Sequence, residues 1–190
     1  DGYAWWMRRL RHTMRFFDKV RIDHFRAFDT FWKIPASCPT AVEGAWIEAP
    51  GYEVIETLQK SIPNLCLAAE DLGDLRPEVT VLKDHFHLPG MKVLEFTINF
   101  QHARAYDEAA ELEHVIAYTG THDNATLLEW YRSLPAAHRR KLRKWLKREG
   151  FCNGSVPRRM IEYTLADRAE TAIIPASDFL ELPASARMNM

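Results

Sequence analysis

The sequence has almost no net charge, few cysteines and no long apolar run. Its 25 basic and 26 acidic residues give a formal charge of -1, so no overall field attracts nucleic acid or a membrane surface, and we expect a neutral partner. No apolar stretch reaches the ~18 to 20 residues of a membrane-spanning helix, and no signal-peptide pattern is present. The odd set of Cys38, Cys66 and Cys152 has no metal-ligand spacing. It fits a reducing compartment, and we expect the cytoplasm.

The rest of the composition is typical of one folded domain. Hydrophobic residues make up 47% of the 190 residues, enough for a sizeable core in a chain of this length. No internal repeat, low-complexity tract or linker divides the chain, so we expect a single domain over residues 1–190. A helical pattern begins almost at Asp1, and we expect the sequence to be a piece of a longer protein.

Helical and strand patterns alternate along the chain. The predicted helices cover 3–18, 52–61, 77–86, 126–150 and 156–171, and the predicted strands cover 20–23, 65–70, 91–96, 115–119 and 172–175. The proline- and glycine-rich stretch 28–51 predicts a long ordered loop, and 97–113 has no clear pattern. Such alternation indicates a parallel sheet covered by helices. We therefore predict an α/β fold, the C-terminal portion (about five βα units) of a TIM (β/α)8 barrel, without the N-terminal strands and the extreme C-terminus.

Three of the predicted strands run from apolar residues into an acid. These acids are Asp23, Glu70 and Asp123. Barrel enzymes place their active sites at the carboxyl ends of the strands, so we expect the three carboxyl groups to converge there. Retaining glycoside transfer needs a carboxylate nucleophile and a protonated carboxylic acid about 5 to 5.5 Å apart. The pattern therefore predicts glycosidic-bond chemistry.

The two-residue period of a strand assigns faces to the first two acids. Arg21 and Asp23 share one face, so a fixed cation would lie beside Asp23 and keep it ionised as the nucleophile. On the second strand Glu70 points into the barrel mouth and Asp71 points toward the helices. Apolar neighbours on that strand would keep Glu70 protonated.

Several short motifs occur in order along nearly the whole chain. They are RIDHFR at 21–26, IPA at 34–36, PTA at 39–41, AEDLG at 69–73, PGM at 89–91, YTGTHDN at 118–124 and ARMN at 186–189. Together they resemble the 4-alpha-glucanotransferases, which are the amylomaltases or disproportionating enzymes of glycoside hydrolase family 77. That family transfers α-1,4-glucan segments from a donor to a glucose or maltooligosaccharide acceptor. The resemblance implies the same reaction here, by a retaining double displacement without metal or organic cofactor.

The resemblance also implies a role for each acid. By it, Asp23 is the nucleophile, Glu70 the general acid/base and Asp123 the transition-state stabiliser. Strand alternation around Gly120 leaves the choice between His122 and Asp123 open, and only the resemblance favours Asp123. Arg21 and His122 match positions that hold the substrate.

Other interpretations stay open. An α-amylase-type hydrolase would use the same three acids, and a non-catalytic glucan-binding fragment would keep the motifs without turnover. Trp46, between two glycine-containing turns, suits stacking on a sugar ring, whereas Phe31 and Trp32 fit core packing equally well. A metal site is a weak alternative for His122 and Asp123 because no HExxH motif or cysteine cluster accompanies them.

Two further features have ordinary structural explanations. His85 and His87 are typical of residues at a helix end rather than of metal ligands. The basic amphipathic helix predicted over 138–148 favours a solvated outer helix over a nucleic-acid or membrane patch, because the net charge of the chain is near zero.

Overall fold

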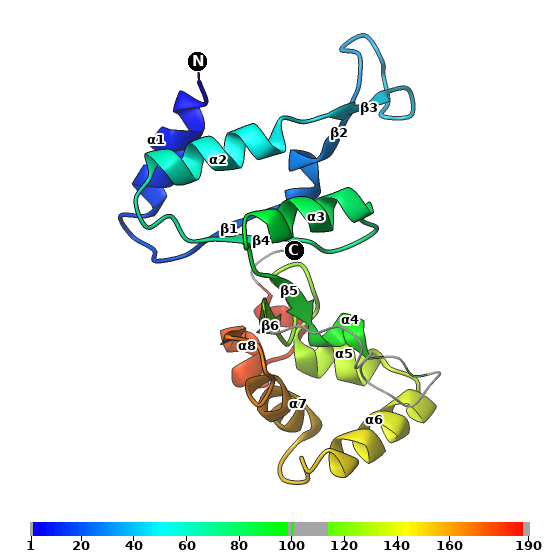
Figure 1. Ribbon diagram of the computed structural model, residues 1–190. Helices are drawn as coiled ribbons and strands as arrows, with labels where there is room; N and C mark the ends of the chain where they lie inside the picture. Colours follow the sequence, from blue (N-terminus) through cyan, green and yellow to red (C-terminus); the bar gives the residue numbers. More distant parts are fainter. Residues whose placement is uncertain (1, 99, 101–113, 188–190) are drawn as a thin grey trace. The chain divides into compact units, whose positions relative to one another are not determined.

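A computed structural model describes residues 2–98, 100 and 114–187 of the chain. It divides into two compact units, one ending at Gly90 and the other beginning at Met91, and each unit is described by itself (Figure 1). The stretch 101–113, which had no clear sequence pattern, lies outside the described residues, as do residues 188–190, which include the end of the last motif. Within the described ranges, no helix is long and apolar enough to cross a membrane.

The first unit packs three helices against a pair of parallel strands. Its elements are α1 (Ala4–Thr13), β1 (Val20–Ile22), the short 3-10 helix η1 (Phe25–Phe28), β2 (Thr30–Lys33), β3 (Ala45–Glu48), α2 (Gly51–Ser61), β4 (Leu67–Ala69) and α3 (Pro77–His85). Strand β1 pairs in parallel with β4, so that Val20 lies opposite Leu67 and Ile22 opposite Ala69. All three residues of β4 are buried, as expected for a parallel strand that helices cover.

The second unit is built on a three-stranded sheet in the order β5-β6-β7. Its elements are β5 (Gly90–Val93), α4 (Leu94–Thr97), β6 (Val115–Tyr118), α5 (Leu127–Ser133), α6 (Ala136–Arg148), α7 (Val156–Leu165), β7 (Thr171–Ile173), α8 (Ala176–Phe179) and η2 (Ala184–Ala186). Strand β6 pairs in parallel with β7. Parallel pairs in both units confirm the predicted α/β class with parallel sheets.

Each unit has its own hydrophobic core. In the first, Leu58 of α2, Val79 and Leu82 of α3, and Leu67 of β4 are almost fully buried around Phe25. In the second, most core residues come from α5, α6 and α7, and they include Leu127, Leu142, Leu146, Met160 and Ile161. Burial of one such side chain contributes about 1.5 to 3 kcal/mol to the stability of its unit.

The five predicted strands are present, but three predicted helices have different limits. The helix predicted over 156–171 ends at Leu165, and Thr171 already belongs to β7. The first helix ends at Thr13 instead of 18, and Phe16 and Phe17 beyond it are exposed. The predicted helix 126–150 is two helices, α5 and α6. The break falls at Leu134 and Pro135, because the residue before a proline is driven out of the helical region; Leu134 has φ -63° and ψ 140°.

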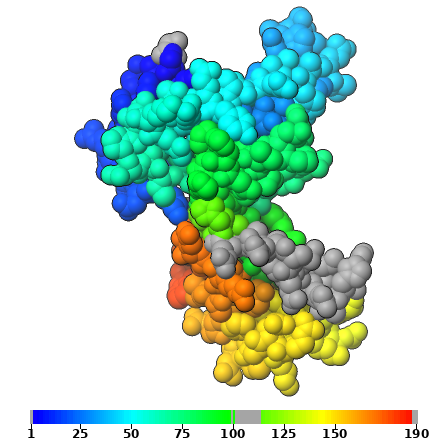
Figure 2. All heavy atoms as spheres, viewed as in Figure 1, coloured from blue at the N-terminus to red at the C-terminus, as the bar shows by residue number. Residues whose placement is uncertain are grey.

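The predicted loop 28–51 contains an antiparallel hairpin of β2 and β3, which corrects the sequence prediction. Trp32 lies opposite Trp46, with the ring centroids 5.4 Å apart. The indole N–H of Trp32 donates to the carbonyl oxygen of Ala41 at 2.9 Å and so fastens the long turn. Figure 2 shows the hairpin projecting from the rest of the first unit, and most of its residues are exposed.

Candidate active site

The first unit brings Asp23 and Glu70 to the ends of two adjacent parallel strands. The backbone N–H of Glu70 donates to the carbonyl oxygen of Ile22 at 2.9 Å, and the N–H of Phe25 donates to the carbonyl oxygen of Glu70 at 3.0 Å. Asp23 follows Ile22 directly in the chain. Both acids therefore leave the sheet at the same edge, the edge where parallel α/β proteins bind their ligands.

The side chain of Glu70 holds the turn that follows Asp23. Its Oε2 accepts the backbone N–H of His24 at 2.7 Å, and its Oε1 accepts that of Leu72 at 3.2 Å. His24 has φ 47°, a left-handed conformation that residues other than glycine adopt rarely. Such a conformation costs on the order of 1 to 3 kcal/mol and persists only where neighbouring bonds support it. The bond from His24 to Glu70 is one such support.

The carboxylate of Asp23 is open to solvent and faces an arginine. The Nη2 atom of Arg21 lies 3.1 Å from Oδ1 of Asp23, whose side chain is 78% exposed. An exposed ion pair contributes only about 0 to 1 kcal/mol to stability, so its main effect is on the orientation of the Asp23 carboxylate. The carboxylate of Asp71 instead pairs with Lys83 of α3 at 2.9 Å. Asp71 thus lies toward the helices, as the strand alternation predicts.

Trp46 presents an aromatic surface on the hairpin of the same unit. Trp46 is 53% exposed, and the guanidinium of Arg26 lies 4.3 Å from the centroid of its ring. Arg26 also donates from Nη1 to the carbonyl oxygen of Asp74 at 2.9 Å, which ties η1 to the loop after β4. A cation on one face orients the indole and leaves other parts of the ring for a ligand.

Asp123 and His122 lie in the second unit, in the loop Thr119–Thr126 between β6 and α5. The side chain of Asp123 is 71% exposed, and its Oδ2 lies 3.3 Å from Nε2 of His122. The Nη2 atom of Arg187 donates to the carbonyl oxygen of Asp123 at 3.1 Å. The proximity of Asp123 to Asp23 and Glu70 stays a prediction, because those two acids belong to the first unit.

A pocket of about 630 Å³ adjoins this loop within the second unit. Its walls are formed by the loop and by α8 with the residues after it, including His122, Asn124, Asp178 and Arg187. Pockets of about 300 to 1,000 Å³ are typical of small-molecule sites. Polar groups on a mostly apolar wall suit a ligand with both hydroxyl groups and C–H surfaces.

Comparison with known proteins decides the family. The sequence profile of the 4-alpha-glucanotransferases, glycoside hydrolase family 77, matches residues 1–190. The chain belongs to this family. It is 41% identical to the 4-alpha-glucanotransferase of Thermus thermophilus over 202 aligned residues, and 33% identical to the chloroplastic/amyloplastic enzyme of Solanum tuberosum over 190. Each alignment covers 100% of this chain but only 39% and 33% of those relatives, so the chain spans well under half of their length.

Solved structures of the family agree in fold. An amylomaltase from Streptococcus agalactiae, determined in complex with acarbose, matches 100% of this chain with a TM-score of 0.83 and 30% identity. The match covers 38% of that protein. Amylomaltase from Corynebacterium glutamicum matches 91% of the chain with a TM-score of 0.74 at 15% identity, which supports the fold alone.

Two buried acids of the second unit escaped the sequence analysis. Glu95, in the first turn after β5, is 8% exposed, and Asp178 of α8 is 2% exposed. Burial and, to a lesser extent, the charge of Asp178 raise the pKa of Glu95 to about 8. Glu95 ends an apolar run just as the three predicted acids do, and that signal could have identified it. Asp178 has no comparable signal, since its partners are distant in the sequence.

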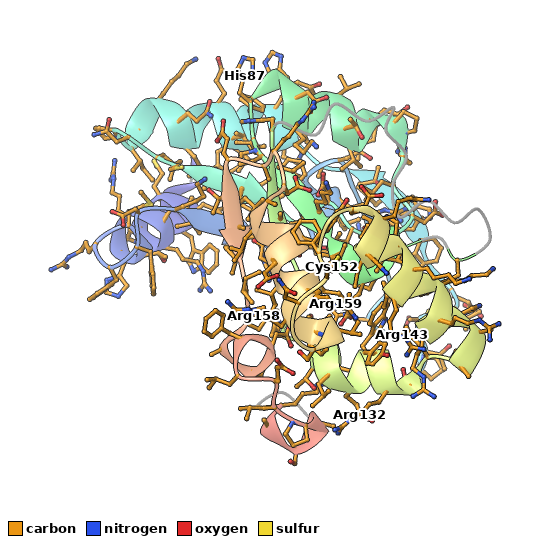
Figure 3. The ribbon with its side chains drawn as sticks, turned by 90° about the horizontal axis from the view of Figure 1, so that it is seen from below. His87, Arg132, Arg143, Cys152, Arg158 and Arg159 are labelled. Carbon is orange, nitrogen blue, oxygen red and sulfur yellow. The ribbon has the colours of Figure 1, made fainter. Side chains whose placement is uncertain are left out.

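His85, His87 and the basic helix are parts of the helical framework. The ring of His85, at the end of α3, contacts those of Tyr52 and Phe86, and His87 lies just beyond that helix (Figure 3). Among the residues with described positions, no group of three His, Cys, Asp or Glu side chains could hold a metal ion. Helix α6 buries three apolar side chains, and its Arg143 donates to the hydroxyl of Tyr131 on α5 at 2.8 Å (Figure 3).

Proposed function

We propose that the complete protein is a 4-alpha-glucanotransferase, and that this chain supplies its catalytic acids. The observation that carries the proposal is the position of Asp23 and Glu70 at neighbouring strand ends, in a chain that belongs to this family over its whole length. The donor is an α-1,4-glucan or maltooligosaccharide, and the acceptor is glucose or another maltooligosaccharide. No organic cofactor or metal takes part in the proposed reaction.

The proposed reaction has two steps. In the first, Asp23 attacks the anomeric carbon of the donor, the glycosidic C–O bond breaks, and Glu70 gives its proton to the departing oxygen. In the second, Glu70 takes the proton from an acceptor hydroxyl, whose oxygen attacks the anomeric carbon and releases Asp23. Arg21 keeps the Asp23 carboxylate oriented before the first step, and between the steps Asp23 is bonded to the anomeric carbon as an ester. Asp123 stabilises the positive charge that develops on the sugar ring in both transition states.

The neighbouring groups supply substrate contacts in this proposal. Arg21 and His122 hold sugar hydroxyl groups next to the acids, and the exposed ring of Trp46 stacks on a sugar face. The pocket beside His122 offers enough volume for sugar rings. The acarbose complex of the related amylomaltase supports a sugar ligand.

We also propose that residues 1–190 form one partial catalytic domain, the C-terminal portion (about five βα units) of a TIM (β/α)8 barrel. Parallel strand pairs in both units and the TM-score of 0.83 to an amylomaltase support this arrangement.

The cysteines Cys38, Cys66 and Cys152 are free, which supports a reducing compartment such as the cytoplasm.

Incubation of the complete protein with maltotriose tests the function. Oligosaccharides longer than maltotriose are expected, together with shorter ones, because a transferase passes glucan segments to sugar acceptors. Glucose and maltose alone would overturn the proposal in favour of a hydrolase, and glucan binding without any turnover would favour a non-catalytic fragment.

Substitution of each acid by its amide tests the roles of the three residues. We expect kcat to fall by several orders of magnitude in each of Asp23→Asn, Glu70→Gln and Asp123→Asn. Near-normal activity of any one variant would refute the role given to that residue.

A further inference from the structure

Asp178 bridges the two ends of the loop that carries His122 and Asp123. Its Oδ2 accepts the hydroxyl of Thr119 at 2.7 Å, and its Oδ1 accepts the backbone N–H of Leu127 at 2.7 Å. Thr119 is the residue after β6, and Leu127 is the first residue of α5. All three groups are buried, with Thr119 and Leu127 completely inaccessible. Both bonds therefore form away from water, where losing either would leave a buried polar group unpaired.

Side-chain bonds also fix the interior of the same loop. Oδ1 of Asn124 accepts the backbone N–H of Thr121 at 2.8 Å and its hydroxyl at 2.7 Å. The backbone N–H of Asp123 donates to the hydroxyl oxygen of Thr121 at 3.3 Å. These bonds set the local shape of the loop, but they do not attach it to the sheet. The carboxylate of Asp178 does, because its partners lie where the loop leaves β6 and where it enters α5.

We propose that Asp178 is a positioning residue for Asp123: by holding Thr119 and Leu127 together, it fixes where the β6–α5 loop presents the Asp123 carboxylate. This inference rests on the proposed glucanotransferase function and adds to it a residue whose carboxylate acts through its bonds to Thr119 and Leu127. Displacement of a catalytic group by about 1 Å can lower a rate about a hundredfold. The two buried hydrogen bonds of Asp178 therefore affect the chemical step through the position of Asp123. Substrate binding depends on many other contacts and is affected less.

Thr119→Val in the complete protein tests the bridge, because valine has nearly the same shape and lacks the hydroxyl. We expect kcat for maltotriose disproportionation to fall roughly 10- to 100-fold, with KM changed less than about threefold. Thr119→Ser keeps the hydroxyl and should keep kcat within about threefold of the wild type. Thr164→Val is the matched control: Thr164 is also buried, but its hydroxyl bonds to Met160 within α7, so its loss should leave kcat unchanged.

Amide hydrogen exchange gives a readout that does not depend on activity. Thr119→Val should speed exchange at Thr121 and Asn124, relative to the amides of β6, whereas Thr119→Ser and Thr164→Val should not. Equal kcat or equal loop exchange in the valine and serine variants at Thr119 would overturn the positioning role while leaving the proposed function intact. Absence of transfer activity in the wild type would instead overturn the proposed function, and with it the positioning of a catalytic Asp123.

Discussion

Replacement of Glu95 by glutamine should stabilise the protein in a strongly pH-dependent way. The Glu95 carboxyl group is buried, and its Oε1 has no hydrogen-bond partner among the residues that the structure describes. Burial, which is the larger cause, and the negative charge of Asp178 raise the pKa of this carboxyl group from its ordinary value of 4.5 to about 8. Both causes disfavour the charged form, so the folded protein keeps Glu95 protonated at neutral pH.

The sign and size of the effect follow from linkage. Between pH 4.5 and about 8 the folded state binds a proton at Glu95 that the unfolded state has lost, so the free energy of unfolding decreases as pH rises through this window. At 1.36 kcal/mol for each pKa unit, the loss attributable to Glu95 is about 3 kcal/mol at pH 7 and about 5 kcal/mol above pH 8. Below about pH 4.5 this group causes no loss.

Glutamine has the size of a protonated glutamate and carries no charge at any of these pH values. The difference in unfolding free energy between Glu95→Gln and wild type should therefore be near zero at pH 4, about 3 kcal/mol at pH 7 and about 5 kcal/mol at pH 8.5. Urea denaturation at the three pH values measures it, and the exposed Glu149→Gln serves as a control with a small difference throughout. A Glu95→Gln difference that does not change with pH, or a Glu95 carboxyl that titrates near 4.5 by NMR, would refute the reasoning.

Two further substitutions test close packing and helix capping. A Cβ atom at Gly51 would lie 2.1 Å from the carbonyl oxygen of Phe28, so Gly51→Ala should destabilise the first unit by roughly 1 to 3 kcal/mol in urea denaturation. Gly120→Ala, whose Cβ would meet its nearest neighbour at 3.4 Å, should change stability little, and equal effects at the two glycines would contradict this packing argument. Ser155→Ala removes the N-cap of α7 and should cost about 1 kcal/mol by the same measurement, whereas Ser155→Thr should restore most of it.

The strands and the pair of acids in the first unit could be predicted because their signals are local. A short apolar run ending in a charged residue marks a buried strand and its end, as at Asp23 and Glu70. The two-residue period then placed Arg21 beside Asp23 and turned Asp71 toward the helices, as the contacts show. Each of these predictions needed only neighbours in the sequence.

The hairpin could not be predicted in this way. Its strands expose most of their side chains, so they lack the alternation of apolar and polar residues that marks a half-buried strand. Pairing of Trp32 with Trp46 crosses a turn rich in proline and glycine, whose sequence is typical of an irregular loop. The cross-strand aromatic contact that holds the hairpin is visible only in three dimensions.

The role of Asp178 is even harder to predict from the sequence. Its two partners, Thr119 and Leu127, are more than 50 residues away in the sequence, and no local pattern links a short helix after the last strand to the loop after β6. Glu95 could have been predicted as a site residue from the apolar run before it. The predicted strand 91–96 instead included Glu95, whereas the strand in the structure ends at Val93. Its carboxyl group lies beside Gly120 of the neighbouring loop, and the charge of Asp178 acts on it, although both residues are distant from Glu95 in the sequence.

The contacts of the two acids in the first unit determine how their variants should be interpreted. The side chain of Asp23 is mostly exposed and pairs with Arg21, so Asp23→Asn removes charge with little effect on packing. Glu70 instead accepts two backbone N–H groups, and a glutamine oxygen can replace only one of its two carboxylate oxygens. Glu70→Gln should therefore lower the free energy of unfolding by about 1 to 2 kcal/mol. It also removes the proton that Glu70 gives to the departing oxygen. A loss of activity in Asp23→Asn at unchanged stability is consequently the cleaner test of the chemistry, and the loss in Glu70→Gln must be compared with its unfolding free energy.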